Sequence, residues 1–161
     1  SEMSARTAKR KTKATDPHAA LIEGLSKALA DTYILRLRTQ CVHWNIEGAL
    51  FFSVHSLTET LYNELALAAD DLAERIRALG AKALGSYGAF AKLTAVDTGE
   101  VTGNDKAMVK ALIKDNEAIV DTLKMAIAAA EAVEDKPSED MLIARRQSHE
   151  KTIWMLKAIV A

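Results

Sequence analysis

The sequence has few of the residues that interrupt or cross-link a chain. Its 161 residues include one cysteine, two prolines and seven glycines, and aromatic residues make up only 5%. The single cysteine excludes a disulfide within the chain, which is typical of proteins of a reducing cytosol. Because glycine and proline are scarce and alanine, leucine, lysine and glutamate are abundant, helix is favoured along most of the chain. We therefore expect an all-α protein.

Long apolar runs are also missing. No stretch approaches the 18 uninterrupted apolar residues of a membrane-spanning helix, so we expect no membrane association. The first residues are basic but lack an apolar segment, and are therefore not expected to act as a secretory signal. The length suits one domain with a proper core. We expect a cytoplasmic protein.

The net charge of −1 conceals an uneven distribution. Residues 1–13 carry five basic side chains and Glu2, a sum of +4, so the remaining 148 residues carry −5. We expect residues 1–15 to form a disordered basic tail and residues 16–161 to form the folded domain. The tail has two interpretations: it binds DNA phosphates without reading sequence, or it only aids solubility. Its basic residues are Arg6, Lys9, Arg10, Lys11 and Lys13.

Apolar residues recur at three- and four-residue steps in four segments, which predicts four long helices. A connection over residues 80–103 separates the second from the third and has a short helix near 86–93. Two helix pairs joined by one long crossover describe a ferritin-like four-helix bundle. The expected helices run from Asp16-Pro17 to about Trp44, from 51–53 to Leu79, from Asn104 to Val133, and from Ser138 as N-cap to about Val160.

The second helix carries a histidine and three acids on one side. At 100° per residue, His55, Glu59, Asp70 and Glu74 fall at about 0°, 40°, 60° and 100°. His43 ends the preceding helix. Imidazole together with carboxylate is a ligand set that suits iron or zinc.

The spacing along this helix limits how these residues can share a metal. Glu59 and Asp70 are 11 residues apart, roughly 16 Å at 1.5 Å per residue. Because metal–ligand bonds are about 2 Å, one ion cannot touch both halves of the stripe. If both halves serve one site, they come from different chains. An antiparallel two-fold pairing of this helix would bring Asp70 and Glu74 of one copy to His55 and Glu59 of another.

Each of these residues also has an ordinary interpretation. Acids four residues apart are common on solvated helix faces, which applies to Asp70 and Glu74. His55 fits a histidine with local hydrogen bonds at a helix start, and His43 fits one that caps the last carbonyls of its helix. Spacing alone leaves these alternatives open.

The motifs around these residues resemble those of the Dps family (DNA-binding proteins from starved cells). They are His-Trp-Asn-Ile-Glu-Gly at 43–48, Phe-Phe-Ser-Val-His at 51–55 and Asp-Asp-Leu-Ala-Glu-Arg-Ile at 70–76, and the resemblance covers about residues 17–160. It implies a hollow shell of twelve bacterial subunits with ferroxidase sites at two-fold interfaces. His43, His55 and Glu59 would come from one chain, and Asp70 and Glu74 from its partner.

The resemblance further implies what the site does. Fe(II) would be oxidised, with hydrogen peroxide as the preferred oxidant, at a di-iron site that zinc can also occupy. Ferric product would be stored inside the shell, and DNA would be protected from oxidative damage. Many family members have Asp where this chain has Glu59, which leaves the metal spacing open. Two alternatives remain: a DNA-compacting, nucleoid-associated protein with weak metal activity, and a helical bundle without a metal role.

Classical ferritins supply Glu-x-x-His pairs within one bundle, and this chain contains no such pair. A di-iron site inside one subunit is therefore disfavoured.

Other residues have two interpretations each. Trp44 and Trp154 either anchor helix packing, which we favour, or lie near the iron and intercept radicals, as the resemblance implies. Acids around Pro137 either line an iron-attracting pore, for which the resemblance implies Asp135 and Asp140 as the candidates, or are ordinary acids at a helix start. We expect Arg75 to form an ion pair across a subunit contact.

Overall fold

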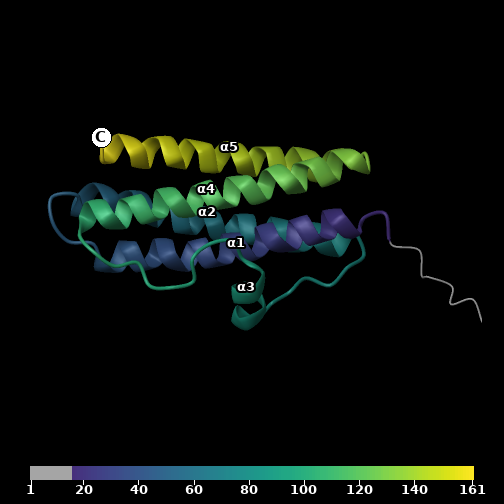
Figure 1. Ribbon diagram of the computed structural model, residues 1–161, viewed down its shortest axis with the longest axis horizontal. Coiled ribbons are helices and arrows are strands. Elements are labelled where there is room, and N and C mark those ends of the chain that lie inside the picture. Colours follow the sequence, from purple (N-terminus) through teal and green to yellow (C-terminus); the bar gives the residue numbers. More distant parts are fainter. Residues whose placement is uncertain (1–15) are drawn as a thin grey trace, which may run out of the picture.

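The computed structural model describes residues 16–161, and all regular structure within that range is helical (Figure 1). This agrees with the predicted all-α bundle and its long crossover with one short helix. No helix in this range is both long and apolar enough to span a membrane. The basic tail predicted for residues 1–15 lies outside the described residues. The helices are α1 (Ala19–Asn45), α2 (Phe51–Ala78), α3 (Tyr87–Leu93), α4 (Asp105–Ala132) and α5 (Lys136–Ile159).

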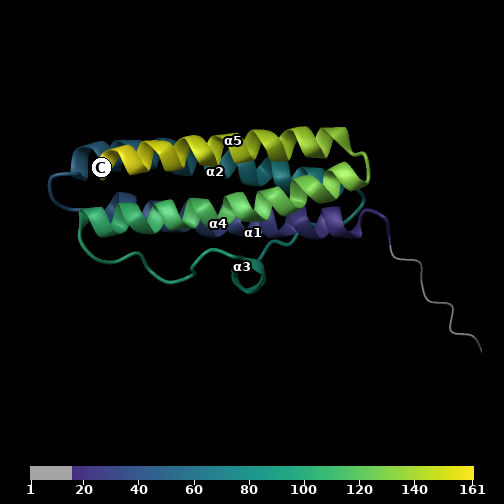
Figure 2. The same cartoon turned by 45° about the horizontal axis from the view of Figure 1, so that its top comes forward.

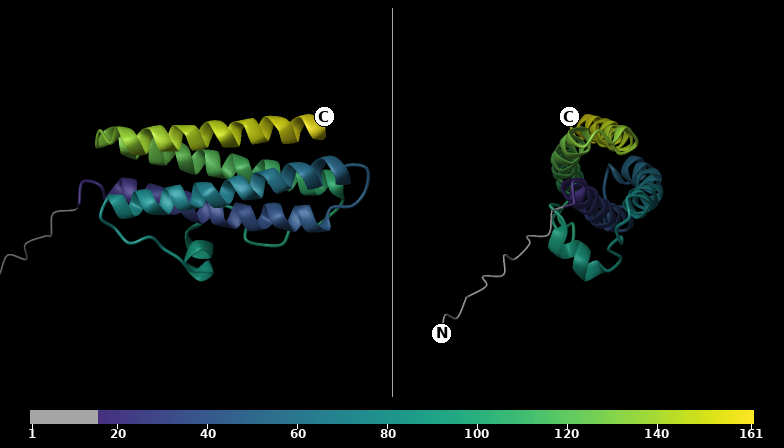
Figure 3. Two further views of the ribbon diagram at one scale, coloured as in Figure 1. Left: turned by 180° about the vertical axis from the view of Figure 1, so that it is seen from behind. Right: turned by 90° about the vertical axis from the view of Figure 1, so that its right-hand side faces the viewer.

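The four long helices surround a common axis, which the end-on view shows (Figure 3). Helix α1 packs against both α2 and α4, and α5 packs against α4. Helix α3 packs on α1 outside the bundle (Figure 2). The α1–α2 turn, the start of α4 and the C-terminus all lie at one end (Figure 1). The largest fully buried side chains come from all four long helices and include Leu25, Leu35, Leu72, Ile76, Leu112, Ile119, Leu142 and Leu156.

Two of the predicted helix starts are confirmed by their caps. The Asn104 side chain accepts a hydrogen bond of 2.9 Å from the Ala107 N–H at the start of α4. Ser86 accepts one of 3.2 Å from the Ala89 N–H at the start of α3. Both side chains satisfy an N–H group that has no partner within the helix.

The start of α2 at Phe51 also agrees with the prediction, whereas two other predicted starts are wrong by two or three residues. Asp16 does not cap α1 but closes a turn before it, accepting a 2.8 Å bond from the His18 N–H, and the helix begins at Ala19. Helix α5 is capped by Asp135 and not by Ser138, whose N–H donates to the Asp135 side chain. Pro137 is tolerated because the N–H groups of the first turn have no partner within the helix.

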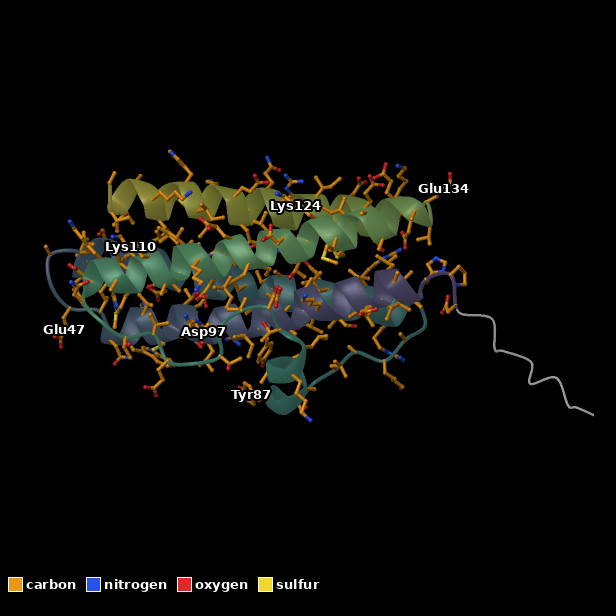
Figure 4. All side chains as sticks on the ribbon, in the orientation of Figure 1. Glu47, Tyr87, Asp97, Lys110, Lys124 and Glu134 are labelled. Atoms are coloured by element: carbon orange, nitrogen blue, oxygen red, sulfur yellow. The ribbon has the colours of Figure 1, made fainter. Side chains whose placement is uncertain are left out.

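The crossover is fixed along α1. The Asp31 carboxylate accepts bonds of 2.6 Å from the Thr94 hydroxyl and 2.7 Å from the Ala95 N–H, just after α3. Further along, Arg38 of α1 forms a buried ion pair with Asp115 of α4 and also donates to the Gly99 carbonyl. Figure 4 places Asp97 in this same part of the crossover, next to α1. These contacts join α1, α4 and the crossover at one level of the bundle.

Candidate metal centre

His43 and His55 form a stacked pair at the end of the bundle that contains the α1–α2 turn. Their ring centroids are 3.8 Å apart and the rings are nearly parallel, at 12°. Each Nδ1 lies against the backbone carbonyl oxygen of the other residue, at 2.7 Å for His43 and 2.8 Å for His55. His43 is buried and His55 is half-buried. The two predicted ligands are therefore held together by reciprocal bonds within one chain.

These bonds determine which nitrogen is free. A carbonyl oxygen only accepts, so each Nδ1 carries the proton and donates it. The neutral ring then has an unprotonated Nε2 with an available lone pair. In metal-binding histidines generally, a hydrogen bond donated by the other ring nitrogen fixes the orientation of the ring. His43 thus does not cap its own helix, whereas His55 does bond a carbonyl of the last turn of α1. That local role leaves its Nε2 unused.

Three neighbours hold the pair, and the sequence interpretation missed them. Phe51 stacks on the other face of His55 with centroids 5.0 Å apart, and the Tyr62 ring meets His43 edge-on at 5.1 Å and 80°. The buried Thr58 hydroxyl oxygen lies 3.2 Å from His43 Nδ1. Thr58 and Tyr62 are three and seven residues after His55, so helical spacing places them on adjoining faces. This spacing is the signal in the sequence by which Thr58 and Tyr62 could have been identified as neighbours of the histidines.

The turn between the two histidines is fixed by α4. Gly48 has φ +103°, a conformation that residues with a side chain rarely adopt. Asp105, the first residue of α4, accepts a 3.2 Å bond from the Leu50 N–H and lies 3.1 Å from where a Cβ on Gly48 would stand. Gly48 therefore lets the turn approach the carboxylate that holds it. Glu47 marks this end of the molecule in Figure 4.

The three predicted carboxylate ligands lie on α2, which runs without interruption for 28 residues. Glu59, Asp70 and Glu74 are exposed, and none of them has a salt bridge within the described chain. Along residues 16–161, no three His, Cys, Asp or Glu side chains come close enough to hold one ion. The structure thus brings His43 and His55 together but places none of the three carboxylates, Glu59 included, with both of them in one chain.

The same face of α2 also exposes large apolar side chains. Phe52 is 81% exposed and Leu67 is 69% exposed. At 100° per residue they lie at about 60° and 120° from His55, within or beside the range of the acids. Exposed apolar groups mixed with unpaired acids are typical of a surface that contacts another chain.

Asp135 has a structural role in the fold. Its side chain is 7% exposed and bonds Arg75 of α2 at 2.9 Å and the Ser138 hydroxyl at 2.9 Å. Burial acts to raise the pKa of Asp135, but the Ser138 and Arg75 bonds outweigh it and hold the pKa below its usual value. Arg75, for which we expected an ion pair across a subunit contact, thus pairs with Asp135 of its own chain. Of the two pore candidates, only Asp140 is exposed.

The tryptophans do not anchor the core of the chain. Trp44 is 62% exposed and Trp154 is 66% exposed, so the packing role that the sequence favoured is wrong within one chain. Trp44 lies beside a groove of about 270 Å³ between α1 and the crossover, which Leu37 and Cys41 also line. Their role near iron stays a prediction.

Comparison with known proteins is consistent across sequence and structure. Residues 22–161 match the ferritin-like domain family. The DNA protection during starvation protein 2 of Bacillus anthracis is 31% identical over 140 residues, which cover 87% of this chain and 96% of that protein. The crystal structure of a Dps protein from Bacillus brevis has a TM-score of 0.88 at 28% identity, covering 92% of this chain and all of that one.

A second solved structure has the same fold. It is a Dps protein from Vibrio cholerae, described as a member of a broad superfamily of ferritin-like diiron-carboxylate proteins. Its TM-score is 0.85 at 25% identity, and the match covers 90% of this chain and 91% of that one. Fold, sequence motifs and relatives agree: the chain belongs to the Dps family of ferritin-like proteins.

Proposed function

We propose that the protein is a ferroxidase and iron store whose oxidation sites form between two copies of the chain. The observation that carries this proposal is the stacked histidine pair, with both Nδ1 atoms occupied and both Nε2 atoms free. His43, His55 and Glu59 would form one half of each site. Asp70 and Glu74 of the partner copy would form the other, and the exposed face of α2 would be the contact.

The donor set suits ferrous iron as substrate. Imidazole binds iron(II) well, and carboxylates favour the iron(III) product because they are hard, charged oxygen donors. Two iron(II) ions side by side supply one electron each to hydrogen peroxide. The O–O bond breaks, two protons are taken up and two water molecules result, so that no hydroxyl radical is released. Ferric ions would then be stored inside a shell of twelve chains, and zinc would compete for the same donors.

Mixing two inactive variants tests whether the site is shared. His43→Ala/His55→Ala lacks the imidazole half, and Asp70→Ala/Glu74→Ala lacks the partner's carboxylate half. If the two variants are unfolded and reassembled together in equal amounts, half of the two-fold pairs are mixed, and each mixed pair has one intact site of two. We expect about a quarter of the native rate of peroxide-driven iron(II) oxidation, measured optically.

The controls are each variant reassembled alone and the native chain reassembled in the same way. Each variant alone should oxidise iron at the background rate of free iron and peroxide. A mixture no faster than its components, while the native chain regains activity, would exclude a site shared between chains. A His43→Ala/His55→Ala variant as active as the native chain would exclude the histidine pair as ligands.

We propose a second function, non-specific DNA binding by the basic tail. It is supported by five Lys and Arg residues within residues 6–13 on a chain whose remainder is acidic. One such tail binds weakly, but twelve on one shell would act together and compact DNA. A gel-shift series at rising salt tests this. We expect binding that weakens steeply with salt and is lost on deletion of residues 1–13, and binding that survives the deletion would refute the tail as its source.

A further inference from the structure

A second polar cluster lies inside the bundle, away from the histidine pair. Arg145 and His149 are four residues apart on α5, and their side chains point between α2 and α4. The Glu64 carboxylate of α2 accepts hydrogen bonds from both terminal nitrogens of Arg145. One of these, Nη2, also lies 3.1 Å from His149 Nε2. Glu64 is nine residues after His55, roughly 13 Å further along the helix axis.

The orientation of His149 follows from Asn116 of α4. The Asn116 amide nitrogen donates a 2.8 Å bond to the Leu112 carbonyl, so its oxygen faces His149 and accepts from Nδ1 at 2.9 Å. His149 Nε2 is then unprotonated and accepts from Arg145. Burial lowers the pKa of His149 to about 3, and the charge of Arg145 acts in the same direction. An imidazole lone pair and a carboxylate therefore face one positive charge.

We infer that Arg145 occupies an interior site that would otherwise bind a divalent transition-metal ion through Glu64 and His149. Nitrogen of imidazole and oxygen of carboxylate are donors for zinc, cobalt(II) and iron(II). Here both approach a single guanidinium nitrogen, at 3.1 Å and 3.4 Å. Arg145 thereby keeps metal out of the bundle interior and confines it to sites at the surface of the chain.

The dimensions of the cluster support this assignment. A metal ion needs its ligand atoms at about 2.0–2.2 Å. The His149 Nε2 atom and the Glu64 carboxylate oxygen lie roughly 1 Å further than this from Arg145 Nη2. The Glu64 side chain is 41% exposed and, among the described residues, its carboxylate is held by Arg145 alone, whereas His149 is buried and bonded to Asn116. The cavity beside the cluster is about 10 Å³, at most the size of one water molecule. A hydrated ion has no room while the arginine side chain is present.

Replacing the arginine tests the inference without relying on the proposed ferroxidase site. All variants carry His43→Ala/His55→Ala, which removes the surface histidines. Cobalt(II) is titrated into the assembled protein, and bound metal is counted by equilibrium dialysis and followed by visible absorption. Arg145→Met, which removes the guanidinium group and its charge but keeps the apolar stem of the side chain, should bind one additional cobalt ion per chain. The matched control is Arg146→Met, because Arg146 is the next residue and pairs with Glu150 on the surface.

Further variants identify the ligands. The additional ion should be absent from Arg146→Met, from Arg145→Lys, which restores a positive charge, and from Arg145→Met/His149→Gln. A folded Arg145→Met chain that binds no additional ion, or binds one that persists without His149, would overturn the inference. If Arg145→Met does not fold by circular dichroism, folding is repeated with zinc present. Recovery of the helical signal with zinc supports the interior site, and failure to recover refutes it.

Discussion

His149 should make the folded protein sensitive to acid, because its neutral form is built into the core. The ring donates from Nδ1 to Asn116 and accepts at Nε2 from Arg145, so both nitrogens are committed. A second proton on the ring would place an N–H group against the guanidinium. Its pKa of about 3 compares with 6.5 for a free histidine. Between these values the unfolded chain binds a proton that the folded chain does not, so stability falls as pH falls below 6.5.

The size of the effect follows from the two pKa values. Each pH unit between them corresponds to 1.36 kcal/mol, so the full loss at pH 3 is about 5 kcal/mol per chain. At pH 4.5 the loss is about 3 kcal/mol, since two of the units have then been passed. This is a large fraction of the 5–15 kcal/mol that stabilises a typical domain.

The assay is denaturant unfolding followed by circular dichroism at pH 7 and pH 4.5, at one protein concentration. The comparison is with His149→Gln, whose amide can donate to Asn116 and accept from Arg145 but does not titrate. The native chain should lose about 3 kcal/mol more than the variant between the two pH values. Other acids titrate in both proteins and cancel in this difference. Equal losses would refute the argument that His149 is held neutral in the core.

Substitutions at three further positions test the packing of the bundle. Arg38→Ala should lower the free energy of unfolding by about 3–5 kcal/mol, because it leaves the buried Asp115 carboxylate unpaired. Gly24→Ala should be destabilising by about 1–3 kcal/mol, since the new Cβ would lie 2.9 Å from the Cβ and 3.0 Å from the Cα of Ala126. Asp135→Ala should be destabilising by about 2 kcal/mol through loss of the α5 cap, and Asp135→Asn by less. Denaturant unfolding measures the free energy of unfolding of each variant. A change below about 0.5 kcal/mol for Arg38→Ala, Gly24→Ala or Asp135→Ala would contradict the reason given for that substitution.

Much of the architecture could be predicted because the sequence contains clear boundaries. Gly48, Gly80 and Asn104 each stand beside the end or the beginning of a helix, and the helical patterns between Gly48 and Gly80 and after Asn104 are long and uninterrupted. The start of α5 was misplaced because both Asp135 and Ser138 are good capping residues. The choice between them depends on Arg75, which is 60 residues away in sequence and holds Asp135 in place.

The site was predictable in part for a related reason. Spacing along one straight helix is a local property, so the separation of Glu59 from Asp70 followed from the sequence. The interior cluster was not predictable, because Arg145 and His149 are polar residues on a helix that also exposes many charges. Only packing against α2 and α4 shows that this part of α5 faces inward. The packing role predicted for the tryptophans was wrong because the prediction assumed that large aromatic side chains are buried within their own chain.

The reciprocal bonding of His43 and His55 has a consequence for the order of events during assembly. The two imidazole rings lose their rotational freedom when the chain folds, so this entropy cost does not oppose metal binding later. A newly folded single chain would therefore offer two fixed imidazoles but lack the partner's acids. If the site is shared as proposed, iron held there would be oxidised only after two chains meet, and mineral would begin to grow only where a shell wall already exists.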